Sequence, residues 1–203
     1  MGGNTRRITL VAVLAGSLTL VASSLLHGAS TGVDPFAAFG VTHVAPGAQE
    51  TAFDLKALDG ATLGSQELAG KVVVLNFWAT WCGPCVAEMP HFQKVVDRYK
   101  KQKDVVFLAI SIDEDKPVVR PFLERNHYTI PVAYDNDAAK AFNVDGVPTT
   151  FIVDRNGVIQ FSDLGFGGDD KEYIDRLVWR IDALLKETSA APQAGPIKER
   201  KNY

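Results

Sequence analysis

The order of apolar and polar residues along the chain predicts an alternation of buried strands and helices. Val72–Trp78 and Val105–Ile112 are almost continuous apolar runs rich in β-branched side chains, which is typical of strands buried on both faces of a sheet. Residues 169–186 instead repeat apolar side chains at helical spacing, as expected of an amphipathic helix packed on a sheet. The pattern therefore predicts an α/β fold with a mixed central sheet and helices on both faces.

Shorter segments complete this prediction. Asp59-Gly60 and Asn156-Gly157 are two-residue turn signals, and the first indicates a β-hairpin at the start of the folded region. Pro90 lies inside an expected helix and should interrupt it with a kink. The remaining expected elements are helices over 82–101 and 113–126, a short strand over 131–134, a short helix over 137–142, and strands over 149–153 and 158–164.

An uncharged apolar run precedes the folded region. Residues 8–26 come after two arginines, Arg6 and Arg7, and about nineteen helical residues are enough to span the ~30 Å hydrocarbon core of a bilayer. Basic residues before an apolar run favour export of the chain on its C-terminal side. The length favours an uncleaved anchor, and small residues at 28–30 leave a removed signal peptide open.

These features divide the chain into four predicted parts. Residues 1–28 are a membrane anchor or signal sequence, 29–47 a spacer, 48–188 the folded domain and 189–203 a disordered tail. The expected location is the inner membrane, with the domain in the periplasm. A soluble periplasmic protein is the alternative if the leader is cleaved.

Composition excludes several classes of protein. The 203 residues are 46% hydrophobic and 22% charged, which excludes a mainly disordered chain. The chain has 21 Lys and Arg residues and 24 Asp and Glu residues, which gives a net charge of −3. No broad cationic surface is therefore available to bind nucleic acid. Because the chain has only two cysteines, a scaffold held by several disulfides is also excluded.

The two cysteines form the candidate reactive site. Cys82 and Cys85 flank Gly83 and Pro84 where a buried strand ends and a helix begins. A thiolate at a helix N-terminus meets unpaired N–H groups, which lower its pKa from the free value of ~8.5. The spacing brings both sulfurs to one face of the first turn, close enough for a disulfide. We expect an exposed Cys82 to attack and a more buried Cys85 to resolve the mixed disulfide.

Other uses of the pair are weaker. A disulfide that closes so short a loop restricts the unfolded chain only slightly, so it would stabilise the fold little. A zinc site needs about four ligands, and the histidines show no ligand-like spacing to these cysteines. Copper carriage stays open for an exported protein, although no adjacent Met or His completes such a site. We therefore predict redox exchange, with no metal and no cofactor beyond a Cys82–Cys85 disulfide.

The segment around the cysteines resembles a known active site. Residues 76–85, Asn-Phe-Trp-Ala-Thr-Trp-Cys-Gly-Pro-Cys, are similar to that of the thioredoxin superfamily, and more narrowly of the membrane-anchored TlpA/ResA-like reductases. Further matches are Glu-Met-Pro at 88–90, Ser-Ile-Asp at 111–113 and Gly-Val-Pro-Thr at 146–149. Over 48–188 the resemblance implies a thioredoxin-like fold with an N-terminal β-hairpin and an inserted helical segment.

The resemblance also implies roles for residues outside the cysteine pair. Pro148 occupies the position of a cis-proline, although X-Pro bonds are cis in only ~5–6% of cases in folded proteins. It would pack against the dithiol and leave the Val147 backbone free to pair with an extended substrate segment. Trp81 would form an apolar lip beside Cys82.

Glu88 is the candidate for proton handling. It lies three residues after Cys85, so the two share a helix face; the alternative is an ordinary solvated helix acid. Asn76 stands where thioredoxin itself has a buried acid, six residues before the first cysteine. A neutral amide cannot accept the proton released by Cys85, which makes Glu88 the nearest candidate base.

The implied function is reduction of periplasmic protein disulfides. The Gly83-Pro84 pair matches the reducing end of the superfamily, and electrons would come from a transmembrane thiol carrier. Apocytochrome c is the implied substrate, and a general periplasmic disulfide reductase is the nearest alternative. A non-enzymatic copper carrier or assembly factor is the alternative from another class. A thiol peroxidase is disfavoured because the chain lacks a Pro-x-x-x-Thr-x-x-Cys segment.

Overall fold

The computed structural model describes residues 54–58, 60, 62–64, 68–167 and 169–187. The predicted leader, spacer and tail lie outside these residues. No helix within the described ranges is long and apolar enough to cross a bilayer.

The described part of the chain alternates strands and helices in the predicted order. The strands are β1 (Asp54–Lys56), β2 (Thr62–Gly64), β3 (Val72–Trp78), β4 (Val105–Ser111), β5 (Val132–Tyr134), β6 (Thr149–Val153) and β7 (Ile159–Leu164). The helices are α2 (Gly83–Tyr99), the 3₁₀ turn η1 (Lys116–Val118), α3 (Val119–Arg125), α4 (Asn136–Ala141) and α5 (Asp170–Lys186).

A five-stranded mixed sheet forms the centre, with strand order β5-β4-β3-β6-β7. Strands β5, β4 and β3 run parallel to one another, whereas β6 is antiparallel to both β3 and β7. Strands β1 and β2 form a separate antiparallel hairpin, which an isolated bridge between Ala57 and Ala133 joins to β5. The predicted mixed sheet and N-terminal hairpin are confirmed.

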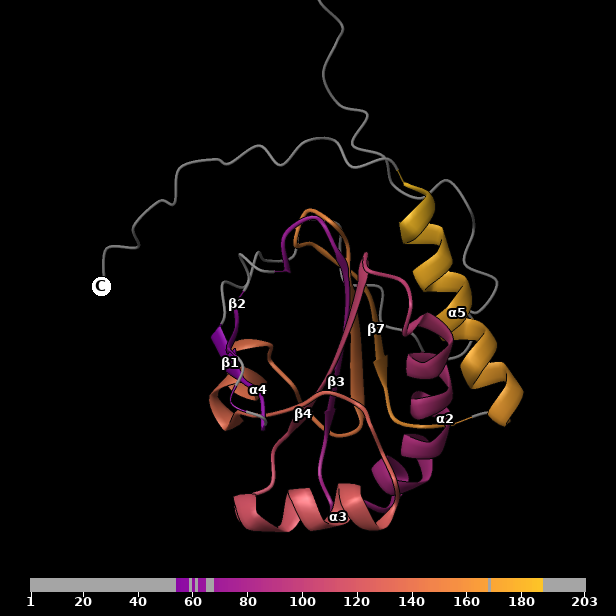
Figure 1. Cartoon of the computed structure of the whole chain (residues 1–203). Helices are drawn as coiled ribbons and strands as arrows, with labels where there is room; N and C mark the ends of the chain where they lie inside the picture. Colours follow the sequence, from indigo (N-terminus) through magenta and orange to yellow (C-terminus); the bar gives the residue numbers. More distant parts are fainter. Residues whose placement is uncertain (1–53, 59, 61, 65–67, 168, 188–203) are drawn as a thin grey trace, which may run out of the picture.

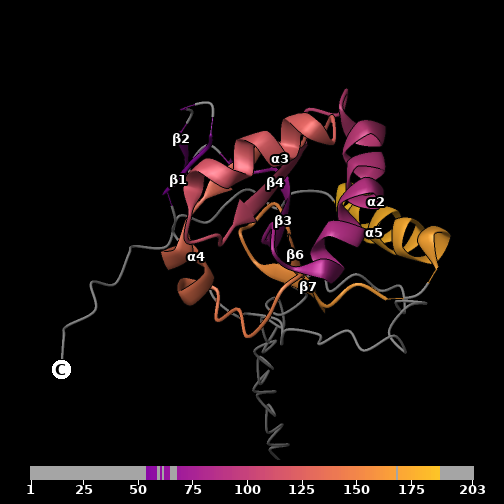
Figure 2. The ribbon, with the colours of Figure 1, turned by 90° about the horizontal axis from the view of Figure 1, so that it is seen from below.

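Helices cover both faces of the sheet, as predicted. Helices α2 and α5 lie side by side on one face, while α4 and the β1–β2 hairpin lie on the other (Figures 1 and 2). Helix α3 contributes Val119 and Phe122 to the core on the α2 side. The sheet therefore separates two apolar cores.

The alternation of side chains along β3 decides what faces helix α2. Val72, Val74 and Trp78 belong to the core under α2, whereas the intervening Val73 and Leu75 face the α4 side. Because successive side chains of a strand point to opposite faces, Asn76 falls on the α2 side. One polar residue is thus placed in an otherwise apolar row beneath the helix that carries the cysteines.

Two predicted helices differ from the structure in detail. Helix α2 runs from Gly83 to Tyr99 with Pro90 inside it, so Pro90 does not end the helix, and the kink expected there stays a prediction. The helix expected from residue 113 begins only with η1 at Lys116. Asp113 is instead buried in contact with Ser111 and Thr80, so its carboxylate is used to hold a neighbouring loop.

Candidate active site

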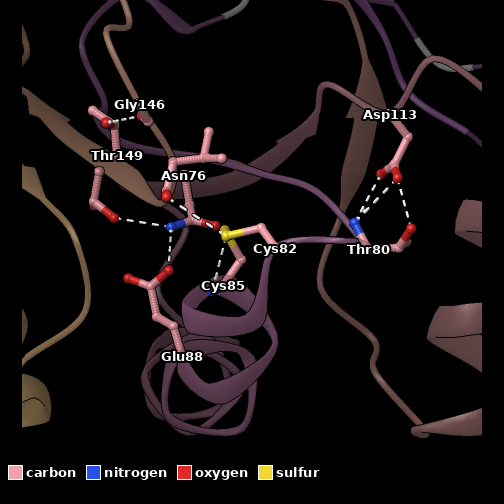
Figure 3. The surroundings of a disulfide bond; sticks show 10 residues. Asn76, Thr80, Cys82, Cys85, Glu88, Asp113, Gly146 and Thr149 are labelled. Atoms are coloured by element: carbon pink, nitrogen blue, oxygen red, sulfur yellow. Dashed lines mark hydrogen bonds between the residues drawn. A yellow bond between two sulfur atoms is a disulfide. The ribbon is translucent and has the colours of Figure 1, made fainter.

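A disulfide joins Cys82 to Cys85 at the start of α2, with their Cα atoms 5.2 Å apart. Cys82 is the N-cap residue, and its Sγ accepts a hydrogen bond of 3.2 Å from the backbone N–H of Cys85. The free N–H groups of a helix N-terminus favour negative charge. The predicted pairing and its place at the strand–helix junction are therefore both present (Figure 3).

The expected exposure of Cys82 is wrong for this disulfide form. Cys82 is 6% exposed and Cys85 is fully buried, so the expected order holds but both side chains are covered. The Cys82 Sγ lies 3.5 Å from the carbonyl oxygen of Val147. That loop is 65 positions away along the chain, and sequence spacing could not place it over the sulfur.

The Val147 loop contains a cis peptide bond before Pro148, which confirms the predicted isomer. Two hydrogen bonds hold the loop from its C-terminal side. The Thr149 hydroxyl donates to the Gly146 carbonyl at 2.6 Å, and the Gly165 N–H donates to the Pro148 carbonyl at 2.7 Å. The loop therefore presents the Val147 backbone to the disulfide from a fixed position at the start of β6.

Glu88 is buried below the disulfide, which overturns its interpretation as a solvated helix acid. Its carboxylate is 2% exposed. The Asn76 Nδ2 donates to one oxygen at 3.0 Å, and the Tyr173 hydroxyl donates to the other at 2.8 Å. The structure thus brings together residues from β3, α2 and α5.

Burial raises the pKa of Glu88 from 4.5 to about 7, because the charged form loses its hydration. The hydrogen bonds from Asn76 and Tyr173 oppose the rise, since they stabilise the carboxylate. Asp163 adds to the rise and Arg176 opposes it through their charges. A carboxyl group that titrates near neutral pH can both accept and release a proton there.

A buried charge cluster lies between β7 and α5, and the sequence prediction missed it. Asp163 accepts two hydrogen bonds of 2.8 Å from Arg180 and one of 3.2 Å from Arg176. Arg180 is fully buried. The available signal was that Arg176 and Arg180 share a helix face with the apolar residues Tyr173 and Leu177.

Asp113 fixes the loop that leads to Cys82, a role that its motif position alone did not reveal. Its carboxylate accepts from the Thr80 N–H at 3.0 and 3.2 Å and from the Thr80 hydroxyl at 2.6 Å. It also accepts from the Ser111 hydroxyl at 2.8 Å. These bonds tie the β3–α2 loop to the end of β4 (Figure 3).

We expect Asp113→Ala to destabilise the fold by about 2 kcal/mol, because it leaves the buried Ser111 hydroxyl and the half-buried Thr80 donors without their acceptor. The Thr80 amide should then exchange its hydrogen faster, which hydrogen-exchange NMR measures alongside urea unfolding. Asp115→Ala is the matched control, since Asp115 is exposed and makes no side-chain cap, and it should change stability by less than about 0.5 kcal/mol. Equal effects of the two substitutions would contradict the assignment.

Two large apolar side chains are exposed on segments that flank the disulfide. Trp81 is 66% exposed and Leu164 is 60% exposed, and the Leu164 side chain lies next to Gly146. Trp81 directly precedes Cys82, so its place fits the predicted lip.

The histidines and carboxylates of the described residues bear on the metal-binding alternatives. Within the described residues, no group of three or more His, Cys, Asp or Glu side chains is arranged to hold a metal ion. His91 pairs with Asp170 at 3.2 Å and stacks on Phe166, so its contacts are local to the α2–α5 side.

Comparisons with known proteins agree with this geometry. The sequence model of the Redoxin family matches residues 44–176. The thiol-disulfide oxidoreductase ResA of Geobacillus kaustophilus is 40% identical over 121 residues, which are 59% of this chain and 69% of the relative. The thioredoxin-like protein YneN of Bacillus subtilis is 40% identical over 116 residues, 56% of this chain and 68% of the relative.

A solved structure shares the fold. The thiol:disulfide interchange protein of the thioredoxin family from Chlorobium tepidum superposes with a TM-score of 0.56 at 26% identity. The superposition covers 64% of this chain and 93% of that protein.

The fold and the cysteine pair define an enzyme of thiol–disulfide exchange built on a thioredoxin-like sheet. The chain belongs to the Redoxin family and is a TlpA/ResA-like member of the thioredoxin superfamily. The predicted resemblance, fold and enzyme class are confirmed at the level of a thiol–disulfide oxidoreductase.

Proposed function

We propose that this protein reduces disulfides of exported proteins, with Cys82 as the attacking sulfur and Cys85 as the resolving one. The observation that carries the proposal is the position of the pair. Cys82 is the N-cap residue of α2, and its Sγ accepts a hydrogen bond from the Cys85 N–H. Cys85 is fully buried. A helix N-terminus favours a thiolate, so the two sulfurs have different environments for different tasks.

The first step forms a mixed disulfide. In the reduced enzyme the Cys82 thiolate attacks one sulfur of the substrate disulfide. The substrate S–S bond breaks, a new S–S bond joins Cys82 to the substrate, and the released substrate sulfur takes up a proton. The Val147 carbonyl, which lies 3.5 Å from the Cys82 Sγ, and the exposed Trp81 next to Cys82 in the chain support a proposed contact of both residues with the substrate chain.

The second step releases the reduced substrate. Cys85 transfers its proton to the Glu88 carboxylate, and its sulfur then attacks the Cys82 Sγ. The mixed disulfide breaks, and the second substrate sulfur leaves and is protonated. Two electrons have passed to the substrate, and the enzyme ends in the Cys82–Cys85 disulfide form. The step needs no cofactor beyond the dithiol.

The direction of exchange depends on the supply of electrons. In an oxidising compartment the disulfide form accumulates unless a donor reduces it. The apolar leader of residues 8–26 supports anchoring at the inner membrane with the domain on the periplasmic side. There a transmembrane thiol carrier would restore the dithiol by the same two steps in reverse. After cleavage of the leader, the same domain would act as a soluble periplasmic enzyme.

Apocytochrome c is the proposed substrate, through the Cys-x-x-Cys-His segment to which haem is attached. The resemblance to the TlpA/ResA-like group supports this choice over a general reductase. Both substrates would use the same cysteines, so the two proposals differ in which disulfides the surface around Cys82 accepts.

A trapping experiment tests the proposal. Cys85→Ser removes the resolving sulfur, so we expect the reduced full-length variant to accumulate disulfide-linked clients through Cys82. Non-reducing electrophoresis followed by mass spectrometry identifies them. Wild-type protein should show few adducts, because Cys85 resolves them, and Cys82→Ser should show none.

The captured proteins distinguish the alternatives. Capture of cytochrome c biogenesis components supports the narrow function, whereas a broad set of exported proteins indicates a general reductase. Client recovery that Cys85→Ser leaves unchanged would instead indicate a copper carrier or assembly factor. Purified wild-type enzyme that fails to reduce both an oxidised Cys-x-x-Cys-His peptide and insulin would exclude disulfide reduction.

A further inference from the structure

Helix α5 places a tyrosine against the buried acid of the site. Tyr173 belongs to the apolar core under α2, together with Leu177 and Ile181 of the same helix. Its hydroxyl nevertheless donates a hydrogen bond of 2.8 Å to one carboxylate oxygen of Glu88. Both side chains are buried, so this bond joins α5 to α2 in the interior, where the two helices lie side by side (Figure 1). None of the proposed steps uses this hydroxyl.

The surroundings of the Tyr173 ring fix the direction of its hydroxyl. Phe166 packs edge-on against the ring with 5.2 Å between centroids, and His91 does so at 6.4 Å. The guanidinium carbon of Arg176 lies 5.7 Å from the centre of the same ring. A ring held from several sides loses little further side-chain entropy when its hydroxyl bonds to Glu88. The donor is therefore in place before any proton moves.

The two carboxylate oxygens of Glu88 each accept a hydrogen bond, from different elements. The Asn76 Nδ2 of β3 donates to the second oxygen at 3.0 Å (Figure 3). Donors of this kind favour the charged carboxylate over the neutral acid, and hydrogen bonds to charged groups are the stronger ones. Loss of the tyrosine hydroxyl should therefore favour the protonated acid, while the Asn76 amide remains in place.

We propose that Tyr173 is a positioning residue of the resolving step, which holds the Glu88 carboxylate ready to accept the proton of Cys85. The hydroxyl acts through Glu88 and not on either sulfur. In that step the S–H bond of Cys85 breaks and a new O–H bond forms on Glu88, whereas Tyr173 keeps its own proton. The inference rests on the proposed function, since it concerns the base of that same step.

The other charges around Glu88 stay the same when only this hydroxyl is removed. Burial and the Glu88 charge raise the pKa of Tyr173 well above its ordinary value, so the wild-type hydroxyl stays a donor. Ionisable groups also lie around Glu88 or against the Tyr173 ring, namely Asp163 of β7, Arg176 of α5, and Cys85 and His91 of α2. Tyr173→Phe alters none of them and keeps the ring. A shift in the pKa of Glu88 in this variant therefore reports the lost hydroxyl.

The direct test is a pH titration of the oxidised full chain by ¹³C NMR, which reads the Cδ signal of Glu88. Glu88→Gln identifies that signal by removing it. We expect the Glu88 midpoint to be about one pH unit higher in Tyr173→Phe than in the wild-type protein, because the carboxylate loses a charge-assisted hydrogen bond.

Tyr99→Phe is the matched control for the titration. The Tyr99 hydroxyl also joins α2 to α5, because it donates to the Asp182 carboxylate at 2.7 Å. It lies about three helical turns beyond Glu88 along α2. Its removal should therefore leave the Glu88 midpoint unchanged, although it deletes the same kind of bond between the same two helices.

The pH profile of turnover separates positioning from a purely structural role. At pH 7 the release phase in Tyr173→Phe should be up to about fivefold slower, because a smaller fraction of Glu88 is ionised. Above about pH 9 the rate should return to the wild-type value, since Glu88 is then ionised in both proteins. In Glu88→Gln, adding Tyr173→Phe should slow release no further. Stopped-flow reduction of a small disulfide measures all of these rates.

A gentler substitution keeps the test usable if the phenylalanine variant does not fold. Replacement of Tyr173 by 3-fluorotyrosine keeps the ring and makes the hydroxyl more acidic, hence a stronger donor. The Glu88 midpoint should then fall below the wild-type value, which is the opposite of the shift expected for Tyr173→Phe.

Two results would overturn the inference. One is a Glu88 midpoint that neither rises in folded Tyr173→Phe nor falls with 3-fluorotyrosine. The other is a release phase that Tyr173→Phe slows equally at pH 7 and pH 9. The titration uses no substrate, so its failure leaves the reductase proposal standing. Failure of the wild-type enzyme to reduce any disulfide would overturn that proposal, while the measured effect of Tyr173 on Glu88 would stand.

Discussion

Glu88→Gln is expected to stabilise the oxidised protein by about 3 kcal/mol at pH 8. In the folded protein the pKa of Glu88 is raised from 4.5 to about 7. Above that value the native state must hold a buried carboxylate that the unfolded chain hydrates freely. A neutral amide of the same shape removes this penalty and keeps an acceptor for the Asn76 Nδ2.

The sign of the pH dependence is set by the same shift. Between about pH 4.5 and 7 the folded protein retains a proton that the unfolded chain has released, so wild-type stability falls as pH rises through this window. Urea unfolding at several pH values should show the fall in wild-type protein and not in Glu88→Gln. Glu124→Gln, at an exposed helix position, should retain it. A wild-type free energy of unfolding that does not change between about pH 4.5 and 7 would contradict the raised pKa of Glu88.

The same substitution should slow turnover. Without a base beside Cys85, release of the mixed disulfide should be at least about 100-fold slower near pH 7. Stopped-flow reduction of a small disulfide measures this, because formation and release of the adduct appear as separate phases. A variant that is more stable and slower in the release phase alone would show that the buried acid serves function at the expense of stability.

Asp163→Ala is expected to destabilise the fold by about 3–5 kcal/mol, which is the usual effect of removing one partner from a buried ion pair. Arg180 is fully buried and Arg176 almost so, and both donate to this carboxylate. The substitution leaves their positive charges without that counter-charge. Chemical denaturation at pH 7 measures the loss of free energy of unfolding.

Two variants separate charge from shape and from general surface effects. Asp163→Asn keeps the size of the side chain and part of its accepting ability, so it should be less destabilising than the alanine. Asp175→Ala breaks the solvent-exposed pair with Lys171 on the same helix and should change stability by less than about 1 kcal/mol. Because the Asp163 charge raises the pKa of Glu88, the pKa of Glu88 should also be lower in Asp163→Ala than in the wild-type protein. Comparable losses in the Asp163 and Asp175 variants would contradict a buried cluster.

Local patterns predicted most of the fold because the physical causes of these elements are themselves local. The apolar runs became β3 and β4, and the helical spacing near the C-terminal end became α5 with Asp169 as its N-cap. The cysteine pair was found from its spacing and its place between a strand and a helix. The cis bond at Pro148 came from a family resemblance, since isolated X-Pro bonds favour trans.

Contacts between distant segments decided the rest of the site. Glu88 was identified as a candidate base, but its burial depends on Asn76 and Tyr173, which lie 12 and 85 positions away. The same holds for the contact between the Val147 carbonyl and Cys82, 65 positions apart, and for the hydrogen bonds between Asp113 and Thr80, 33 positions apart. No periodicity records such pairings, since each arises only when the sheet assembles.

The amino-acid sequence by itself determined the order of strands and helices, the pair of sulfurs at a helix start and the class of chemistry. Those properties depend on side-chain spacing over a few turns or one strand. Only the tertiary structure decided the protonation chemistry: which acid is buried, which amide touches it and which charges lie behind it. Desolvation sets the proton affinity of a group, and desolvation is a property of the packed fold rather than of any segment.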